Sequence, residues 1–129
     1  MTRHVLIVDD ERPARTLLEH ALAPLEDLDV ELHTIEDSSQ ALALVSTQRI
    51  DLALIDVHMP GMGGLELCRK LRSFTNASKA FIILMDEKGH ELASHTLANL
   101  EADGFETKPF DPEETLRRVS EALGLNLEE

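Results

Sequence analysis

The sequence contains no tryptophan or tyrosine, only one cysteine, and no apolar run long enough to span a membrane. With Cys68 alone, no disulfide can form within the chain, so a reducing compartment is the simpler expectation. The amino-terminal apolar run, residues 4–8, is too short for a signal peptide or a membrane helix. We therefore expect a cytoplasmic protein with no membrane association, in which Cys68 is a core thiol and not a reactive group.

Basic residues are also scarce, because 12 Lys and Arg stand against 25 Asp and Glu, for a net charge of -13. Proteins that bind DNA or RNA contact the phosphates through clustered Lys and Arg. This charge balance disfavours direct nucleic-acid binding. Most of the acids are expected to form a solvated surface that keeps the domain soluble.

The length of 129 residues suits one domain with a sizeable core and leaves no room for a second. We expect the domain to cover residues 1–124 and a weakly apolar tail to cover residues 125–129. With 43% hydrophobic residues but only four Phe, the core should consist mainly of Leu, Ile, Val and Ala.

Short apolar segments alternate with segments whose apolar residues have helical spacing. The five expected strands cover residues 4–8, 30–34, 52–56, 80–85 and 104–107. The expected helices begin near Pro13, at a cap on Ser38 or Ser39, near Leu67, at His90, and after a cap on Asp111. The helix that begins at His90 is expected to extend to Leu100. Because parallel neighbours need helical crossovers, this alternation predicts an open, doubly wound α/β sheet.

Residues 52–64, LALIDVHMPGMGG, run from apolar side chains into Asp56 and then into a loop rich in Pro and Gly. The apolar part lacks polar alternation, which is typical of a strand covered on both faces. Asp56 would then end the strand, at the edge where open α/β sheets bind ligands. Taken alone, it is equally compatible with an acid that opens a turn before Pro60 and Gly61.

Other expected strands also end in charged residues, and the carboxyl ends of parallel strands share one edge of the sheet. Asp9 and Asp10 follow the first strand, Asp86 the fourth and Lys108 the fifth, beside Asp56 of the third. Crowded carboxylates repel unless they share a cation, and oxygen ligands suit Mg²⁺.

A carboxylate beside a divalent ion and an ammonium group can attack a phosphorus atom, because both cations neutralise the transferring oxygens. Asp56 would then be the nucleophile that forms an aspartyl phosphate. The alternative is a set of turn acids with Lys108 as a structural counter-ion.

Three stretches, VLIVDDE, DLALIDVHMPGMGGLEL and ADGFETKPF, together resemble the receiver domain of two-component response regulators, the CheY-like superfamily. The resemblance implies a flavodoxin-like (βα)5 fold with strand order 2-1-3-4-5. It also implies that Asp56 is the phosphoacceptor. Asp10 and Asp56 would coordinate Mg²⁺ with the backbone carbonyl of His58, and Asp9 would help through water.

The resemblance assigns further roles around this site. Lys108 would pair with the phosphoryl group, Pro109 would follow a cis peptide bond, and Phe105 would be the aromatic switch. Asp86 departs from the family, because it occupies the place of a Thr or Ser hydroxyl that binds the phosphoryl group. Glu87 departs too, since Ala or Gly is usual there.

These departures leave the switch open to more than one interpretation. If the register slips by one residue, Met85 takes the hydroxyl position and also lacks a hydroxyl. Asp86 could point at the phosphoryl space and repel it, or hold Lys108 in the unphosphorylated state. We also expect His58 to tune the lifetime of the phosphoryl group, whereas a metal site made by His90 and His95 is disfavoured.

The resemblance implies a signalling module and not a free-standing enzyme. It would take a phosphoryl group from a sensor histidine kinase or a phosphotransfer protein and relay a conformational change to a downstream effector domain or protein. The expected output face combines the fourth helix, the fifth strand and the last helix. Both a monomer and a homodimer are compatible with the sequence.

Two rival functions remain. An atypical pseudo-receiver would have the same fold and would bind a protein partner without being phosphorylated. A magnesium phosphohydrolase of the haloacid-dehalogenase kind fits less well, because Asp9 and Asp10 are adjacent and not two residues apart.

Overall fold

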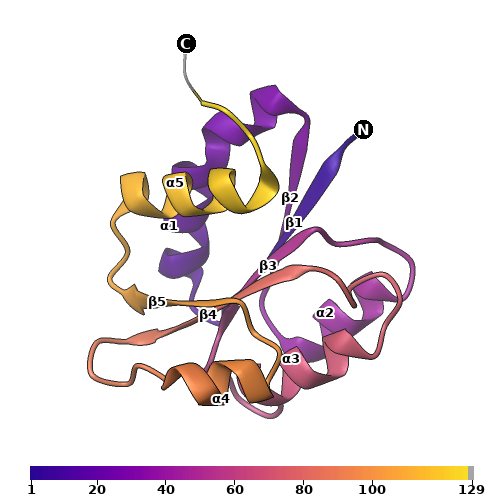
Figure 1. Ribbon diagram of the computed structural model, residues 1–129, viewed down its shortest axis with the longest axis vertical. Helices are drawn as coiled ribbons and strands as arrows, with labels where there is room; N and C mark the ends of the chain where they lie inside the picture. The colour runs from indigo at the N-terminus through magenta and orange to yellow at the C-terminus, as the bar shows by residue number, and fades with distance from the viewer. Residues whose placement is uncertain (128–129) are drawn as a thin grey trace.

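Five parallel strands form one sheet in the order β2-β1-β3-β4-β5, as expected (Figure 1). The computed structural model describes residues 1–127. The strands are β1 (Arg3–Val8), β2 (Val30–Ile35), β3 (Leu52–Asp56), β4 (Phe81–Glu87) and β5 (Gly104–Lys108). The helices are α1 (Arg12–Leu22), α2 (Ser38–Val45), α3 (Gly64–Arg72), α4 (Ser94–Asn99) and α5 (Pro112–Leu123), with a 3-10 helix η1 (Ala23–Leu28) after α1.

The helices cover both faces of the sheet, so the central strands are apolar throughout. All five residues of β3 are buried, which agrees with its unbroken apolar sequence. On one face, the sheet packs against α1 and α5 through a cluster that includes Leu18, Leu22, Leu54 and Val119. On the other face, α2 and α3 pack on a cluster that includes Val45, Ile55, Leu67 and Cys68. Cys68 is fully buried, and burial raises the pKa of its thiol to about 11, as suits a core thiol.

The cap predicted for α2, Ser38 or Ser39, is wrong by one or two residues. Asp37 is the N-cap, and its carboxylate accepts a hydrogen bond from the backbone N–H of Gln40 at 2.8 Å, whereas Ser38 already belongs to the helix. Aspartate and serine are both good N-caps, so the residue type alone does not choose between them. The cap predicted for α5 is confirmed, because Asp111 accepts hydrogen bonds from the N–H groups of Glu113 and Glu114.

The largest error concerns the fourth helix, which was expected from His90 to Leu100. Helix α4 covers only Ser94–Asn99, none of its residues is buried, and residues 88–93 form a turn and irregular chain. The preceding strand is longer than predicted, since Asp86 pairs with Thr107 and Glu87 with Lys108. His90 therefore leaves the helix and lies close to the end of β4.

At the carboxyl end of the chain, Leu125 and Leu127 pack against the cluster beneath α1 and α5. The last two residues of the expected tail lie outside the described residues. Within residues 1–127, none of the helices combines the length and the hydropathy that a membrane crossing requires.

Candidate functional site

The carboxyl ends of β1, β3 and β5 bring Asp9, Asp56 and Lys108 into direct contact. The ammonium nitrogen of Lys108 lies 2.8 Å from a carboxylate oxygen of Asp9 and 3.3 Å from one of Asp56. A more distant pair joins it to Glu11 at 3.7 Å. Asp9 is fully buried and Asp56 is 5% exposed. The predicted convergence of these residues at one sheet edge is therefore present in the structure.

This crowding changes the protonation of the site. Burial, followed by the negative charge of Asp9, raises the pKa of Asp56 to about 6 against the opposing effect of Lys108. Burial lowers the pKa of Lys108, but its hydrogen bond to Asp9 and the charges of Asp9 and Asp56 outweigh this and raise the pKa overall. At neutral pH, Asp56 is ionised and Lys108 is positively charged.

The same edge offers a set of oxygen ligands. Asp9, Asp10 and Asp56 each contribute one carboxylate oxygen, and the three atoms lie within 4.8 Å of one another. Three hard oxygen donors, one of them from the exposed Asp10, fit a partly hydrated Mg²⁺ ion. A cation there would also relieve the repulsion that raises the pKa of Asp56. The residues present therefore fit the expected metal, although the role of the His58 carbonyl stays a prediction.

Gly64 holds the loop after β3 close to the site. The sequence reasoning missed this residue. Its backbone N–H donates a hydrogen bond to the carbonyl of Val57 at 2.9 Å. A Cβ atom at Gly64 would lie 2.1 Å from the carbonyl oxygen of Asp56, so a larger residue cannot fit without moving the backbone. The glycine-rich end of PGMGG was the available signal for this close approach.

The carboxylate of Asp86 contacts two histidines. One carboxylate oxygen lies 3.0 Å from Nε2 of His58, and the other lies 3.4 Å from Nδ1 of His90. Within residues 1–127, the ion pairs of Lys108 involve Asp9, Glu11 and Asp56, so the suggestion that Asp86 holds Lys108 is wrong. Met85, the alternative residue for the hydroxyl position, has a side chain that is fully buried in the core beneath α1 and α5.

Two further expected positions lie on or after β5. The peptide bond between Lys108 and Pro109 is cis, as expected. Phe105 is half-buried against the cluster beneath α2 and α3, and its carbonyl accepts a hydrogen bond from Arg118 of α5 at 3.0 Å. The aromatic position is thus tied to α5, three residues before Lys108.

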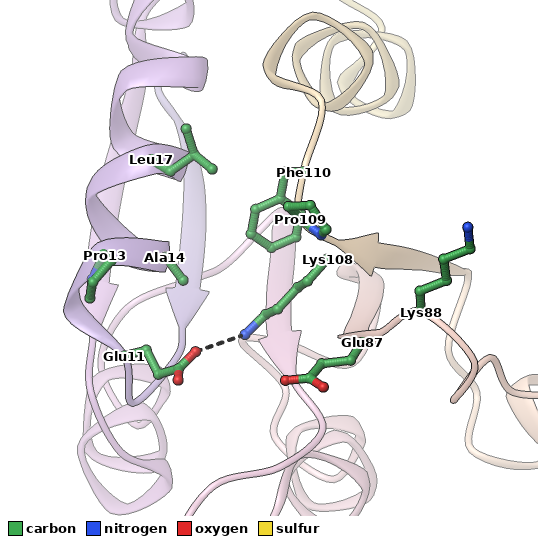
Figure 2. Close-up of a pocket in the computed structure, with 9 residues that line it drawn as sticks. All are labelled: Glu11, Pro13, Ala14, Leu17, Glu87, Lys88, Lys108, Pro109 and Phe110. Atoms are coloured by element: carbon green, nitrogen blue, oxygen red, sulfur yellow. Dashed lines mark ion pairs between the residues drawn. The ribbon is translucent and has the colours of Figure 1, made fainter.

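A cavity of about 500 Å³ opens beside Lys108 (Figure 2). Its lining comes from the start of α1, the end of β4 and the segment after β5: Glu11, Pro13, Ala14, Leu17, Glu87, Lys88, Lys108, Pro109 and Phe110. Figure 2 shows the Lys108 side chain crossing the opening toward Glu11, with Pro13, Ala14 and Leu17 on one wall and Glu87 on another. A group that enters this cavity contacts the apolar side chains of one wall and reaches the charged pair of Lys108 and Glu11.

Comparison with known proteins agrees with this geometry. The family described as the response regulator receiver domain matches residues 5–120. The chain is 36% identical over 124 residues to the cyclic di-GMP phosphodiesterase response regulator RpfG of Xanthomonas campestris pv. campestris (strain 8004). That match covers 95% of this chain but 32% of RpfG, so the chain spans about a third of that relative.

Solved structures of similar length have the same architecture. The chemotaxis response regulator CheY4 of Vibrio cholerae superimposes with a TM-score of 0.81 at 28% identity, covering 95% of this chain and 99% of CheY4. A CheY-like receiver domain protein from Methanospirillum hungatei JF-1 gives a TM-score of 0.79 at 26% identity, covering 96% of this chain and 95% of that protein.

Proposed function

Because the chain belongs to the response regulator receiver domain family, we propose that it accepts a phosphoryl group on Asp56 from the phosphohistidine of a sensor histidine kinase or a phosphotransfer protein. The observation that carries the proposal is the position of Asp56. It is buried, it lies 3.3 Å from the ammonium nitrogen of Lys108, and two further carboxylates lie beside it. Residues 1–124 would form the receiver domain.

In the transfer step, a carboxylate oxygen of Asp56 attacks the phosphorus atom. The new P–O bond forms as the P–N bond of the phosphohistidine breaks, and the bonding electrons leave with the imidazole nitrogen, which then takes a proton. Lys108 stabilises the negative charge on the transferring oxygens, while Asp9 holds its ammonium group at 2.8 Å. When bound by Asp9, Asp10 and Asp56, together with the His58 carbonyl, Mg²⁺ would neutralise the same charge.

The cavity beside Lys108 supports a route for the phosphodonor. It lies between the start of α1 and the segment after β5, and Lys108 is part of its lining (Figure 2). Its apolar wall, made by Pro13, Ala14 and Leu17, could pack against a donor side chain that presents a phosphoryl group.

Signal output would leave by the surface made from α4, β5 and α5. Phe105 and Lys108 lie on the same short strand, and Phe105 is hydrogen-bonded to Arg118 of α5. A change in the position of Lys108 can therefore reach both β5 and α5. The recipient would be an effector domain or protein, and the domain itself would act as a signalling module and not as an enzyme.

One observation favours the pseudo-receiver as a second candidate. Asp86 lacks the hydroxyl expected at its position, and a carboxylate cannot donate a hydrogen bond to a phosphoryl oxygen unless it is protonated. A domain that cannot complete the switch would act through constitutive protein contacts made by the same fold.

The test is incubation with acetyl phosphate and Mg²⁺, followed by intact-mass measurement of the wild type and Asp56→Asn. A phosphoryl adduct on the wild type that is absent from the variant supports the proposal. No adduct on either protein favours the pseudo-receiver, and an adduct on the variant moves the nucleophile elsewhere. Steady hydrolysis of many phosphomonoesters would favour the phosphohydrolase instead.

A further inference from the structure

A cluster of two imidazoles and one carboxylate lies next to the acidic site and has no role in the proposed transfer step. We infer that the side chains of His58, Asp86 and His90 form a binding site for a divalent transition-metal ion of the zinc type. Its three side-chain ligands differ from the carboxylates of the Mg²⁺ site, Asp9, Asp10 and Asp56, and the only shared residue is His58, whose backbone carbonyl is assigned to that site. The inference does not depend on phosphorylation of the chain.

The geometry of the cluster is already close to that of a metal site. The side chains of His58 and His90 approach different oxygens of Asp86, at 3.0 and 3.4 Å. One ligand atom from each of the three residues lies within 4.8 Å of the other two. The two imidazole rings meet edge to face, with centroids 5.8 Å apart. Small side-chain rotations would direct all three ligand atoms at one ion.

The carboxylate is fixed, whereas the imidazoles are accessible. The side chain of Asp86 is 5% exposed, and the backbone N–H of Glu87 donates a hydrogen bond to one of its oxygens at 2.7 Å. A hydrogen bond of this kind orients a metal-binding carboxylate. The side chains of His58 and His90 are 69% and 56% exposed, so an ion can reach the cluster from solvent.

The ligand types select the class of ion. Imidazole nitrogen suits zinc and its neighbours among the transition metals, whereas Mg²⁺ prefers oxygen ligands. Two imidazoles and one carboxylate supply three ligands of a tetrahedral site and leave the fourth position for water or another ligand. The two adjacent sites therefore differ in chemistry, one having oxygen donors and the other mainly nitrogen donors.

The site would join the segments that follow the paired strands β3 and β4. His58 follows β3, and His90 belongs to the turn between β4 and α4. An ion held by both would link these segments beside Asp56. No other residue of the turn at 88–93 is needed as a ligand.

A second histidine cluster, formed by His4, Glu31 and His33, is the main competitor. Its two imidazole nitrogens lie 3.0 Å apart and share a hydrogen bond. Its carboxylate oxygens are 3.7 and 3.9 Å from those nitrogens, on a side chain that is 59% exposed. The second cluster thus lacks the buried, oriented oxygen that Asp86 provides.

The experiment is a calorimetric titration of Zn²⁺ into the metal-free chain, with excess Mg²⁺ present to occupy the carboxylate site. The wild type is compared with His58→Asn, which keeps the backbone carbonyl, and with His90→Asn. The controls are His33→Asn, which removes the second cluster, and His95→Asn. His95 is exposed in α4 and belongs to none of the three candidate metal clusters found among residues 1–127.

We expect one Zn²⁺ site whose affinity falls by roughly 10-fold or more in His58→Asn and in His90→Asn, because each loses a ligand. The site should keep its affinity in both controls. Co²⁺ used as a visible probe should give tetrahedral absorption bands that the same two variants lose, and circular dichroism checks that all variants fold. The inference is overturned by absence of binding to the wild type, by unchanged affinity in the two variants, or by a site that only His33→Asn removes.

Discussion

Replacing Asp56 with asparagine should make the metal-free protein more stable at neutral pH. The pKa of Asp56 is raised from 3.8 to about 6, first by burial and then by the charge of Asp9. A pKa raised in the folded state means that ionisation of the group opposes folding. The stability that the protonated Asp56 carboxyl contributes is fully present below pH 3.8 and is lost as the pH rises through about 6. Asparagine cannot ionise, so the variant avoids this loss.

The pKa values set the size and the pH range of the effect. A shift of this size corresponds to about 2–3 kcal/mol of unfolding free energy, because one pKa unit is worth about 1.4 kcal/mol. The gain should therefore be about 2–3 kcal/mol at pH 7.5 and below about 1 kcal/mol at pH 4. The variant also loses the contact between Asp56 and Lys108, but Lys108 keeps its closer partner Asp9, at 2.8 Å.

Urea unfolding in the presence of a chelator measures this difference. The chain has no Trp or Tyr, so far-ultraviolet circular dichroism is the suitable signal. With a slope near 2 kcal/mol per molar urea, the midpoint at pH 7.5 should rise by about 1–1.5 M. Asp27→Asn, which changes an exposed acid of η1, is the matched control and should leave the midpoint almost unchanged. Added Mg²⁺ should stabilise the wild type more than the variant and so reduce the gain.

Two results would refute the reasoning. If Asp56→Asn has no higher midpoint than the wild type at pH 7.5, then ionised Asp56 does not destabilise the fold. If the gain is the same at pH 4 and pH 7.5, it arises from packing or from the unfolded state and not from ionisation.

Three further predictions concern single residues of the site. Asp10→Asn should weaken Mg²⁺ binding by roughly 10-fold in calorimetry, because a ligand oxygen becomes an amide; an unchanged titration would exclude a shared ion. Asp86→Thr, with Glu87→Ala added if access is limiting, should raise phosphoryl or beryllofluoride occupancy. The reason is that the Asp86 carboxylate and a phosphoryl group carry like charges, which repel by about 3–4 kcal/mol when roughly 4–5 Å apart at an effective dielectric near 20. Equal occupancy would show that Asp86 does not oppose the phosphoryl group. Gly64→Ala should lose more than about 2 kcal/mol of stability in urea unfolding, because its Cβ would overlap the Asp56 carbonyl; an unchanged midpoint would contradict the close approach.

Much of the acidic site could be predicted from the sequence because its residues are tied to the ends of strands. Apolar runs that stop at Asp9 and Asp56 mark both the strand and its terminus. Alternation with helices makes the strands parallel, and parallel strands bring their carboxyl ends to one edge. The contacts of Lys108 with both acids follow from this topology. The order of the strands came from the resemblance to a family and not from local patterns.

The contacts between loops needed the tertiary structure. Local spacing placed His90 in a helix with His95, but the pairing of Asp86 with Thr107 extends β4 and leaves His90 in a turn. Only then can Asp86 meet His90 from its own segment and His58 from the loop after β3.

The sequence by itself determined the five strands and the five α-helices as types, and the charged residues at the ends of β1, β3 and β5, because apolar periodicity and abrupt charge act over a few neighbouring positions. Only the tertiary structure decided which partner Asp86 takes and why residue 64 must be glycine. Both depend on the distance between segments that are remote in the chain, and no local pattern encodes that distance. The register of β3 against β4 and the close approach of α3 to the Asp56 carbonyl set those distances.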